Sequence, residues 1–170
     1  MPGGDARGIM AVMRRLLLLL AVLTALTGCG GSEEAACGPV TREALDPNAG
    51  LHVLPDQDQP RYTTDPPTSG AHYSLPPPTG AVDEPIDRPL QVTALEGGRV
   101  LVQYRDLPAA DVSALEALAD DRTIVAPNPD QAEPVVMTAW ITKQTCSGVD
   151  REILESFIDE QQGRGPGTDF

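Results

Sequence analysis

The sequence predicts an α+β domain in which a small mixed sheet carries two helices packed on one face. From residue 90 onward, short apolar runs typical of strands alternate with segments whose apolar residues recur every three or four positions. One such helical segment lies between two strand-like runs, which favours a crossover connection. Before residue 90 prolines are frequent, and residues 39–89 are predicted to form a long Pro-rich loop segment.

The first predicted strands are Leu90–Leu95 and Val100–Tyr104, joined by a hairpin-type turn at Glu96–Arg99. A helix is predicted from Pro108 to Asp121, because its apolar residues fall on one face and an aspartate lies near its start.

The next strands are Thr123–Ala126 and Val135–Thr142, and the last helix is predicted to begin near Ser147 and to end by Gly163. The resulting order is β-β-α-β-β-α. The helical crossover makes the strand at Thr123–Ala126 parallel to the strand at Val100–Tyr104, followed by a hairpin, and both helices lie on the same face of the sheet.

The N-terminus resembles the signal of a bacterial lipoprotein. The basic residues of Met13-Arg14-Arg15 precede an apolar run, Leu16–Leu26, which is too short to span a bilayer. Leu26-Thr27-Gly28-Cys29 follows and resembles a lipobox, whose cysteine is diacylated and becomes the mature N-terminus. Two acyl chains anchor a protein stably, so the predicted location is the outer face of the cytoplasmic membrane. Met13 is as credible a start as Met1.

These signals divide the chain into three parts. Residues 1–28 are predicted to be the lipoprotein signal peptide and residues 29–38 a flexible tether. Residues 39–170 form a single domain, with the Pro-rich part at 39–89 and the sheet and helices at 90–163.

The charge of the chain excludes one class of partner. Asp and Glu number 25 against 12 Lys and Arg, for a net charge of −13. Such a surface repels nucleic acid, and no nucleic-acid motif is present. The predicted partners are the membrane, through the N-terminal lipid, and a protein or small ligand. Solubility of an exported domain is the simpler explanation of the charge, and the sequence favours it.

Two cysteines remain if Cys29 is acylated. In an exported domain, the pair Cys37 and Cys146 favours a disulfide over free or metal-binding thiols, because no metal-ligand spacing supports the latter. Closing a loop of about 110 residues contributes about 4–5 kcal/mol in the chain-entropy model.

The stretch Tyr62–Tyr73 has neither helical nor strand periodicity, yet it is stiff and chemically rich. Prolines fix its backbone, hydroxyls and a glycine follow, and a histidine able to act as base, acid or metal ligand comes next. Its candidate ligand-binding residues are Pro66, Pro67, Thr68, Ser69, Gly70, His72 and Tyr73. An ordered connector whose histidine caps a turn is the alternative interpretation.

Three segments together resemble one bacterial family. They are Tyr62 with Pro66-Pro67-Thr68-Ser69-Gly70-Ala71-His72-Tyr73, the turn Leu95-Glu96-Gly97-Gly98 leading into Val100-Leu101-Val102, and Thr138-Ala139-Trp140. From about His52 to Gly165 the chain is similar to domain-of-unknown-function family 3105, found in exported and membrane-attached bacterial proteins. The family has no established activity, so the resemblance implies a domain and no chemistry.

One departure from the family bears on metal binding. The family pattern before the apolar strand reads His-Ser-Leu-Glu-His-Gly, whereas this chain reads Thr93-Ala94-Leu95-Glu96-Gly97-Gly98. The leucine, the glutamate and the last glycine match, and both histidines are replaced, by Thr93 and Gly97. The resemblance therefore implies that any divalent-metal site here is weak or absent, and no other cofactor is expected.

Two histidines and a carboxylate nevertheless remain as candidate metal ligands: His52, His72 and Glu96. Such a set holds a divalent metal with open positions if the three converge in space. The stiffness of the loop and its joint occurrence with the turn in the family pattern predict that Tyr62–Tyr73 packs against Glu96–Arg99. In this interpretation His72 is partly exposed in a cleft.

The leading functional hypothesis is a non-enzymatic, membrane-anchored lipoprotein that binds a partner or ligand through its Pro-rich part. The alternative is a metal-dependent enzyme or metal-handling protein that uses His52, His72 and Glu96. A hydrolase with Ser69 as nucleophile and His72 as base is weaker, because no nucleophile elbow surrounds the serine. The distance between the two histidine rings and the glutamate discriminates between the first two hypotheses.

Overall fold

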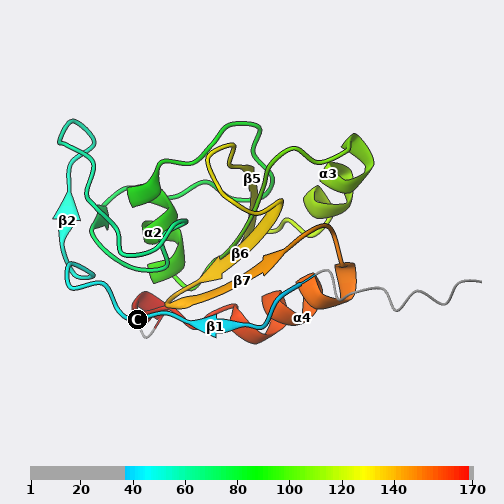
Figure 1. The fold of residues 1–170 in the computed structure, drawn as a ribbon. Coiled ribbons are helices and arrows are strands. Elements are labelled where there is room, and N and C mark those ends of the chain that lie inside the picture. The colour runs from blue at the N-terminus through cyan, green and yellow to red at the C-terminus, as the bar shows by residue number, and fades with distance from the viewer. Residues whose placement is uncertain (1–36, 169–170) are drawn as a thin grey trace, which may run out of the picture. The chain divides into compact units, whose positions relative to one another are not determined.

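A computed structural model describes residues 37–168, which contain a mixed sheet, a small second sheet and several helices (Figure 1). The elements are β1 (Thr41–Arg42), β2 (His52–Val53), β3 (His72–Tyr73), α2 (Arg88–Glu96), β4 (Val100–Tyr104), α3 (Ala109–Glu116), β5 (Thr123–Pro127), β6 (Val135–Ala139), β7 (Thr142–Cys146), α4 (Arg151–Gln161) and the 3-10 helix η1 (Pro166–Thr168). The predicted signal peptide and Cys29 lie outside the described residues.

The main sheet has the order β1-β7-β6-β4-β5. Strands β4 and β5 are parallel, with Val102 opposite Val125, and the helical crossover predicted between them is α3. All other pairs in this sheet are antiparallel. β6 pairs with β4 rather than with β5, so the predicted hairpin after the strand Thr123–Ala126 is wrong. The α+β class with a mixed sheet is therefore confirmed.

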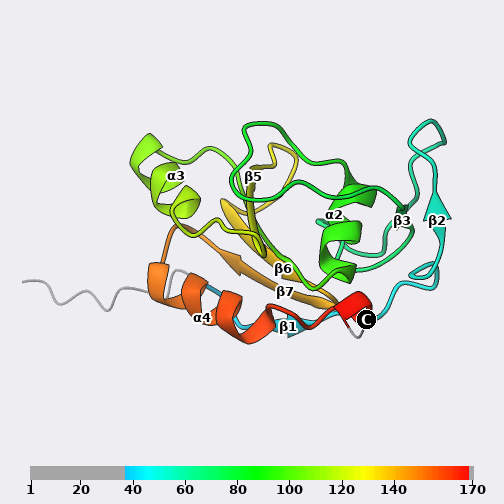
Figure 2. The same ribbon diagram turned by 180° about the vertical axis from the view of Figure 1, so that it is seen from behind.

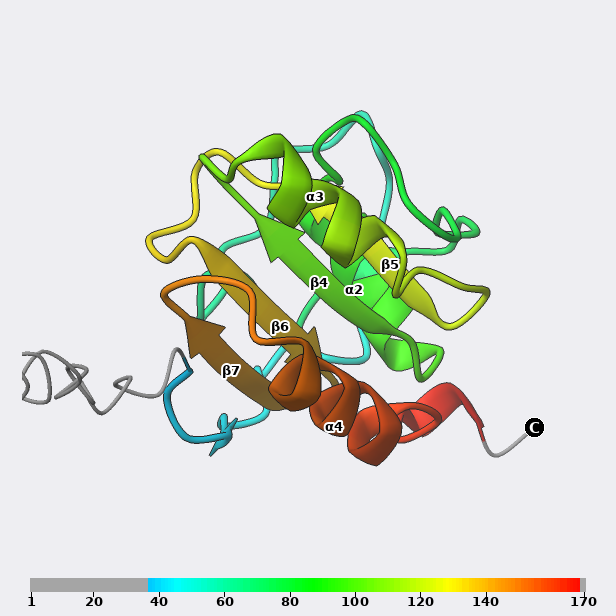
Figure 3. The ribbon, with the colours of Figure 1, turned by 90° about the vertical axis from the view of Figure 1, so that its right-hand side faces the viewer.

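The two faces of the sheet carry different helices. Figure 3 shows α3 and α4 in front of the sheet and α2 behind it. Side chains from α3 and α4 form one core with alternate residues of β4, β5 and β6, among them Leu115, Phe157, Val102 and Met137. The intervening residues of the strands form a second core with α2, and Leu101 and Leu95 belong to it. Two helices on one face is the predicted arrangement, and the third helix is additional.

That third helix corrects a prediction, because Leu90–Leu95 is not a strand but the body of α2. Pro89 occupies the first turn, where its missing N–H is not needed. Val92 and Leu95, three residues apart, are both fully buried, which is the spacing of a helix face. Gly98, with φ 74°, then ends the helix, so the predicted hairpin turn is a helix C-terminus.

A second correction concerns the predicted strand Val135–Thr142, which is two strands. β6 ends at Ala139, and Trp140-Ile141 turns the chain into β7 so that Ala139 pairs with Thr142. Ile141 takes φ 49°, a left-handed conformation that residues other than glycine adopt mainly at turns. Because a β-branched residue is unusual at such a turn, the sequence predicts a single strand over 135–142.

Both predicted helices on the common face are shorter than expected. α3 ends at Glu116 rather than at Asp121. α4 begins at Arg151 rather than near Ser147, and it is capped by Asp150, whose carboxylate accepts a hydrogen bond from the backbone N–H of Ile153 at 3.2 Å.

The predicted disulfide is confirmed. Cys37 and Cys146 are joined by an S–S bond of 2.03 Å, which ties the start of the described chain to the end of β7. Among the helices in residues 37–168, none has the length and apolar character that crossing a bilayer requires.

The small sheet positions the candidate site. β2 and β3 are two residues long, lie parallel, and occupy the same end of the domain as α2 (Figures 1 and 2). Their register places His52 opposite His72.

Candidate functional site: a histidine–histidine–glutamate cluster

The loop that carries His72 is buried and held by specific fits. Every residue from Pro66 to Tyr73 is buried, and the Tyr62 hydroxyl donates a hydrogen bond to the carbonyl of Ala71 at 2.7 Å. Burial, with smaller contributions from Tyr73 and Asp46, raises the pKa of Tyr62 far above its usual value, so the phenol remains a donor. This loop therefore supports His72 rigidly.

Gly70 is required at its position for two reasons. Its φ is 136°, which side chains rarely adopt, and a Cβ there would lie 2.7 Å from the ring of Tyr62. The neighbouring Ser69 accepts a hydrogen bond from the backbone N–H of Asp46 at 2.9 Å. Its hydroxyl is thus structural, and within residues 37–168 no hydrogen bond joins Ser69 to His72. The geometry does not favour the serine hydrolase.

His72 has a defined tautomer. Its Nδ1 lies 3.0 Å from the carbonyl oxygen of Gly70, and a carbonyl only accepts, so Nδ1 carries the proton and donates. In the neutral ring Nε2 therefore holds a lone pair. The side chain is 1% exposed, which corrects the prediction of partial exposure in a cleft. The backbone N–H of His72 also donates a hydrogen bond to the carbonyl of Leu51, which joins the loop of His72 to the residue before β2.

Glu96 faces that lone pair. Its Oε2 lies 2.7 Å from His72 Nε2, and the glutamate side chain is 31% exposed. The approach is close, but its angles do not make a hydrogen bond, and no other residue between 37 and 168 is a partner of Nε2. Two lone-pair atoms at this distance repel each other unless a cation lies between them. Either a proton on Nε2 or a metal ion bound to both atoms would remove this repulsion.

His52 completes the cluster. The parallel pairing of β2 and β3 brings its ring edge-to-face against His72, with centroids 4.7 Å apart. One donor atom from each of His52, His72 and Glu96 can be chosen so that all three lie within 4.8 Å of one another. The ligand atoms of a tetrahedral zinc ion lie about 3.3 Å apart, so shared coordination would require the donors, of which His72 Nε2 and Glu96 Oε2 are 2.7 Å apart, to adjust toward that spacing. His52 is exposed, which leaves the cluster open to solvent on its side.

The two positions at which the resemblance in the sequence implies histidines, Thr93 and Gly97, are close to Glu96 in the chain. Thr93 precedes Glu96 by one helical turn, and its hydroxyl lies 2.8 Å from the carbonyl of Tyr73 and 3.0 Å from that of Pro89. Gly97 is exposed, and a Cβ there would lie 3.1 Å from a guanidinium nitrogen of Arg99. On a helix, positions 93, 96 and 97 share one face. In a strand, position 96 would face the opposite side from positions 93 and 97.

The expected packing of the loop against Glu96–Arg99 holds through Glu96, since His72 contacts its carboxylate directly. The sequence did not reveal the pairing of His52 with His72, because strands of two residues show no periodicity. It also did not reveal Asp46 as a support for Ser69, and no sequence signal marks that contact.

The fold and this cluster define an α+β domain with a partly buried His–His–Glu set at one end. Residues 52–169 match the sequence model of the family described as "Protein of unknown function (DUF3105)", and the chain belongs to that family. The match begins at His52 and includes all three members of the cluster. No curated protein and no solved structure shows a significant match to the chain.

Proposed function

We propose that this domain binds a divalent transition-metal ion through His52, His72 and Glu96. The observation that carries the proposal is the position of His52. A proton on His72 would relieve the contact with Glu96 without involving His52, whereas a metal ion would use all three donors, which lie within 4.8 Å of one another. Among the hypotheses from the sequence, this convergence favours the metal-handling alternative.

The donor set indicates the kind of ion. Two imidazoles and one carboxylate suit zinc, copper, iron and nickel better than magnesium or calcium, which prefer oxygen ligands. The hydrogen bond from His72 Nδ1 to the Gly70 carbonyl is the outer-shell support that metal-binding histidines usually have.

Three protein donors leave coordination positions open. Structural zinc sites are normally closed by four protein ligands, whereas open sites exchange water, substrate or another donor. His72 and Glu96 supply a buried and a half-buried donor, and His52 lies toward solvent. This arrangement supports a role in carrying or presenting a metal, with entry from the His52 side.

Titration of the purified, untagged full chain with Zn²⁺ and with Cu²⁺ tests the proposal. The sequence contains only these two histidines, so any imidazole signal belongs to the cluster. We expect one ion per chain, loss of binding in His72→Ala, and at least about tenfold weaker binding in His52→Ala and Glu96→Gln, since each removes one donor. Acidification should weaken binding, because protons compete for the ring nitrogens.

Glu155→Gln is the matched control, because Glu155 pairs with Arg151 on the surface of α4, far along the chain from the cluster. It should leave the affinity unchanged. Equal binding by the wild type and by His72→Ala, or no binding of either ion, would refute the metal site.

Partner binding is the second candidate, and a specific observation supports it. Leu51, Leu54 and Leu75 are 53%, 61% and 48% exposed, and each lies within three residues of His52 or His72. A contiguous patch of exposed leucines is typical of a docking surface, and these three are close to the two histidines in the sequence. Simultaneous replacement of the three by serine should abolish capture of a partner from a membrane extract without changing metal affinity. Unchanged capture would remove this candidate.

We also propose that Cys29 anchors the protein by its lipid to the outer face of the cytoplasmic membrane. The lipobox-like Leu26-Thr27-Gly28-Cys29 and the short apolar run before it support this. Cys29→Ala should move the protein out of the membrane fraction. Mass spectrometry that finds an unmodified Cys29 in the mature protein would exclude the anchor.

A further inference from the structure

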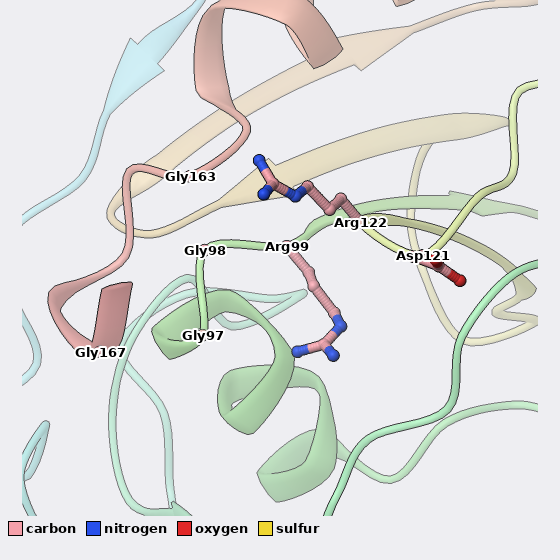
Figure 4. Close-up of a pocket in the computed structure, with 7 residues that line it drawn as sticks. All are labelled: Gly97, Gly98, Arg99, Asp121, Arg122, Gly163 and Gly167. Carbon is pink, nitrogen blue, oxygen red and sulfur yellow. The ribbon is translucent and has the colours of Figure 1, made fainter. Parts of the chain in front are cut away.

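A second candidate site lies at the C-terminus of α2. A pocket of about 650 Å³ opens where β4 and β5 begin (Figure 4), and its volume falls within the range of small-molecule sites. The residues that line it are Gly97, Gly98, Arg99, Asp121, Arg122, Gly163 and Gly167.

Two arginines dominate the chemistry of this pocket. Arg99 and Arg122 directly precede β4 and β5, and the register of those parallel strands places the two residues side by side. The backbone N–H of Val100 donates to the carbonyl of Arg122 at 2.9 Å, which fixes this arrangement.

Neither guanidinium has a carboxylate partner within residues 37–168, whereas Arg88 and Arg151 are both ion-paired there. The Nε–H of Arg99 is buried and has no acceptor. Arg99 is thus a half-buried cation whose charge no described side chain balances.

Two acidic residues near the pocket do not remove its positive character. Asp121 lines the pocket, but Figure 4 shows its carboxylate directed away from both guanidiniums. Asp120 accepts hydrogen bonds from the backbone N–H groups of Arg122 and Thr123 at 2.8 and 2.6 Å. Burial opposes ionisation of Asp120, yet these hydrogen bonds lower its pKa. The charged carboxylate therefore interacts with the backbone of the turn before β5.

The rest of the wall is glycine, which lets a ligand approach the backbone closely. The N–H groups of Gly97, Gly98 and Gly163 are already bonded to backbone carbonyls, so the arginines supply the attraction. Figure 4 shows the Arg122 guanidinium extending toward Gly163 and that of Arg99 extending beside α2. A ligand in contact with both must carry negative charge at two points.

We propose that this pocket binds a ligand that bears a diphosphate group, with Arg99 and Arg122 each contacting one phosphate. Guanidinium groups bind phosphate oxygens in a bidentate manner, which gives both charge and geometric selection. The chain is acidic as a whole, but charges beyond about 10 Å are screened at physiological salt, and the two arginines act at contact distance.

Calorimetric titration of the purified full chain with inorganic pyrophosphate, in buffer freed of metal ions, tests this site separately from the His–His–Glu cluster. We expect pyrophosphate to bind more tightly than phosphate. Arg99→Gln and Arg122→Gln should each weaken binding by about ten- to a hundredfold, as expected for loss of charge-assisted hydrogen bonds. Geranyl diphosphate distinguishes a lipid-linked source from a soluble one: tighter binding than pyrophosphate indicates the former, and equal binding the latter.

Arg105→Gln is the matched control. Arg105 follows the opposite end of β4, and its substitution removes the same charge as the substitutions in the pocket. It should change pyrophosphate affinity less than twofold. A melting temperature close to that of the wild type in all three variants would show that binding, not folding, is measured. If Arg105→Gln weakens binding as much as the pocket variants do, or if citrate binds more tightly than pyrophosphate, the diphosphate site is overturned.

Discussion

The sheet and the Pro-rich part of this domain are stabilised in different ways. In the sheet, stability comes from many equivalent apolar contacts: Val100, Leu101 and Val102 are consecutive and all fully buried, because both faces of β4 are covered. In the Pro-rich part, single contacts decide the conformation, such as the Tyr62 ring against Gly70 and the Ser69 hydroxyl on Asp46. The many apolar contacts of the sheet therefore specify the fold, whereas a few individual contacts in the Pro-rich part position the His–His–Glu cluster.

The largest expected effect concerns the covalent link between the start of the described chain and the end of β7. The double variant Cys37→Ala, Cys146→Ala removes a crosslink between residues 109 positions apart. We expect the free energy of unfolding to fall by about 4–5 kcal/mol in the chain-entropy model. Urea unfolding measures it, and the wild type under reducing conditions should match the variant. A loss below about 1 kcal/mol would contradict an entropic role for the crosslink.

A core truncation tests whether the sheet tolerates damage independently of the cluster. Phe157 packs with α4 against the sheet and is 2% exposed. Phe157→Ala should cost about 3–5 kcal/mol in unfolding free energy. Metal affinity of the folded fraction should stay unchanged, because Phe157 belongs to the core on the opposite face from α2. A parallel loss of affinity would show that the two parts are coupled.

Gly70→Ala tests the other mode of stabilisation. The new Cβ would collide with the Tyr62 ring and impose strain at φ 136°, so we expect a loss of about 1–3 kcal/mol together with loss of the cluster geometry.

Two glycines serve as controls for that substitution. Gly80 has φ 72° with open space around it, so Gly80→Ala reports backbone strain alone. Gly50 also has open space and no positive φ, so Gly50→Ala should have almost no effect. Circular dichroism melts rank the three variants, and equal losses in Gly70→Ala and Gly80→Ala would show that the Tyr62 contact is unimportant.

The same contrast explains how much the sequence predicted. The mixed sheet, the parallel pair β4 and β5 and the helices α3 and α4 were predictable because each repeats an apolar spacing over several residues. The assignment of α2 failed because Leu90, Val92 and Ala94 also alternate like a strand, and only Pro89 and the burial of Leu95 mark the helix. Short apolar runs are ambiguous in this way.

The candidate site was predictable in its residues but not in its geometry. His52, His72 and Glu96 stood out as the chain's histidines and a carboxylate of the family pattern. Their convergence depends on a two-residue parallel pairing and on a helix that the sequence presented as a strand. The arginine pocket escaped entirely, since two arginines 23 positions apart become neighbours only through strand register.

The smallest expected effect on stability comes from restoring a family histidine. Position 93 lies one turn before Glu96 on the same face of α2, and the Thr93 hydroxyl lies 2.8 Å from the carbonyl of Tyr73, the residue after His72. A histidine there would reach the cluster as a fourth donor. Thr93→His should tighten Zn²⁺ or Cu²⁺ binding at least about tenfold, because a fourth protein ligand closes the site. Loss of the threonine hydrogen bond should cost only about 0.5–1.5 kcal/mol.

Two further histidine variants make that result specific. Ser113→His places a histidine on the exposed surface of α3 and should leave metal affinity unchanged. Gly97→His restores the other family histidine, but its Cβ would lie 3.1 Å from the Arg99 guanidinium, so the gain should be smaller than at position 93 unless Arg99 moves. Competition titration against a chelator ranks the variants. If Thr93→His binds no better than Ser113→His, position 93 does not face the metal, and the site would have to be built from His52, His72 and Glu96 without that helix position.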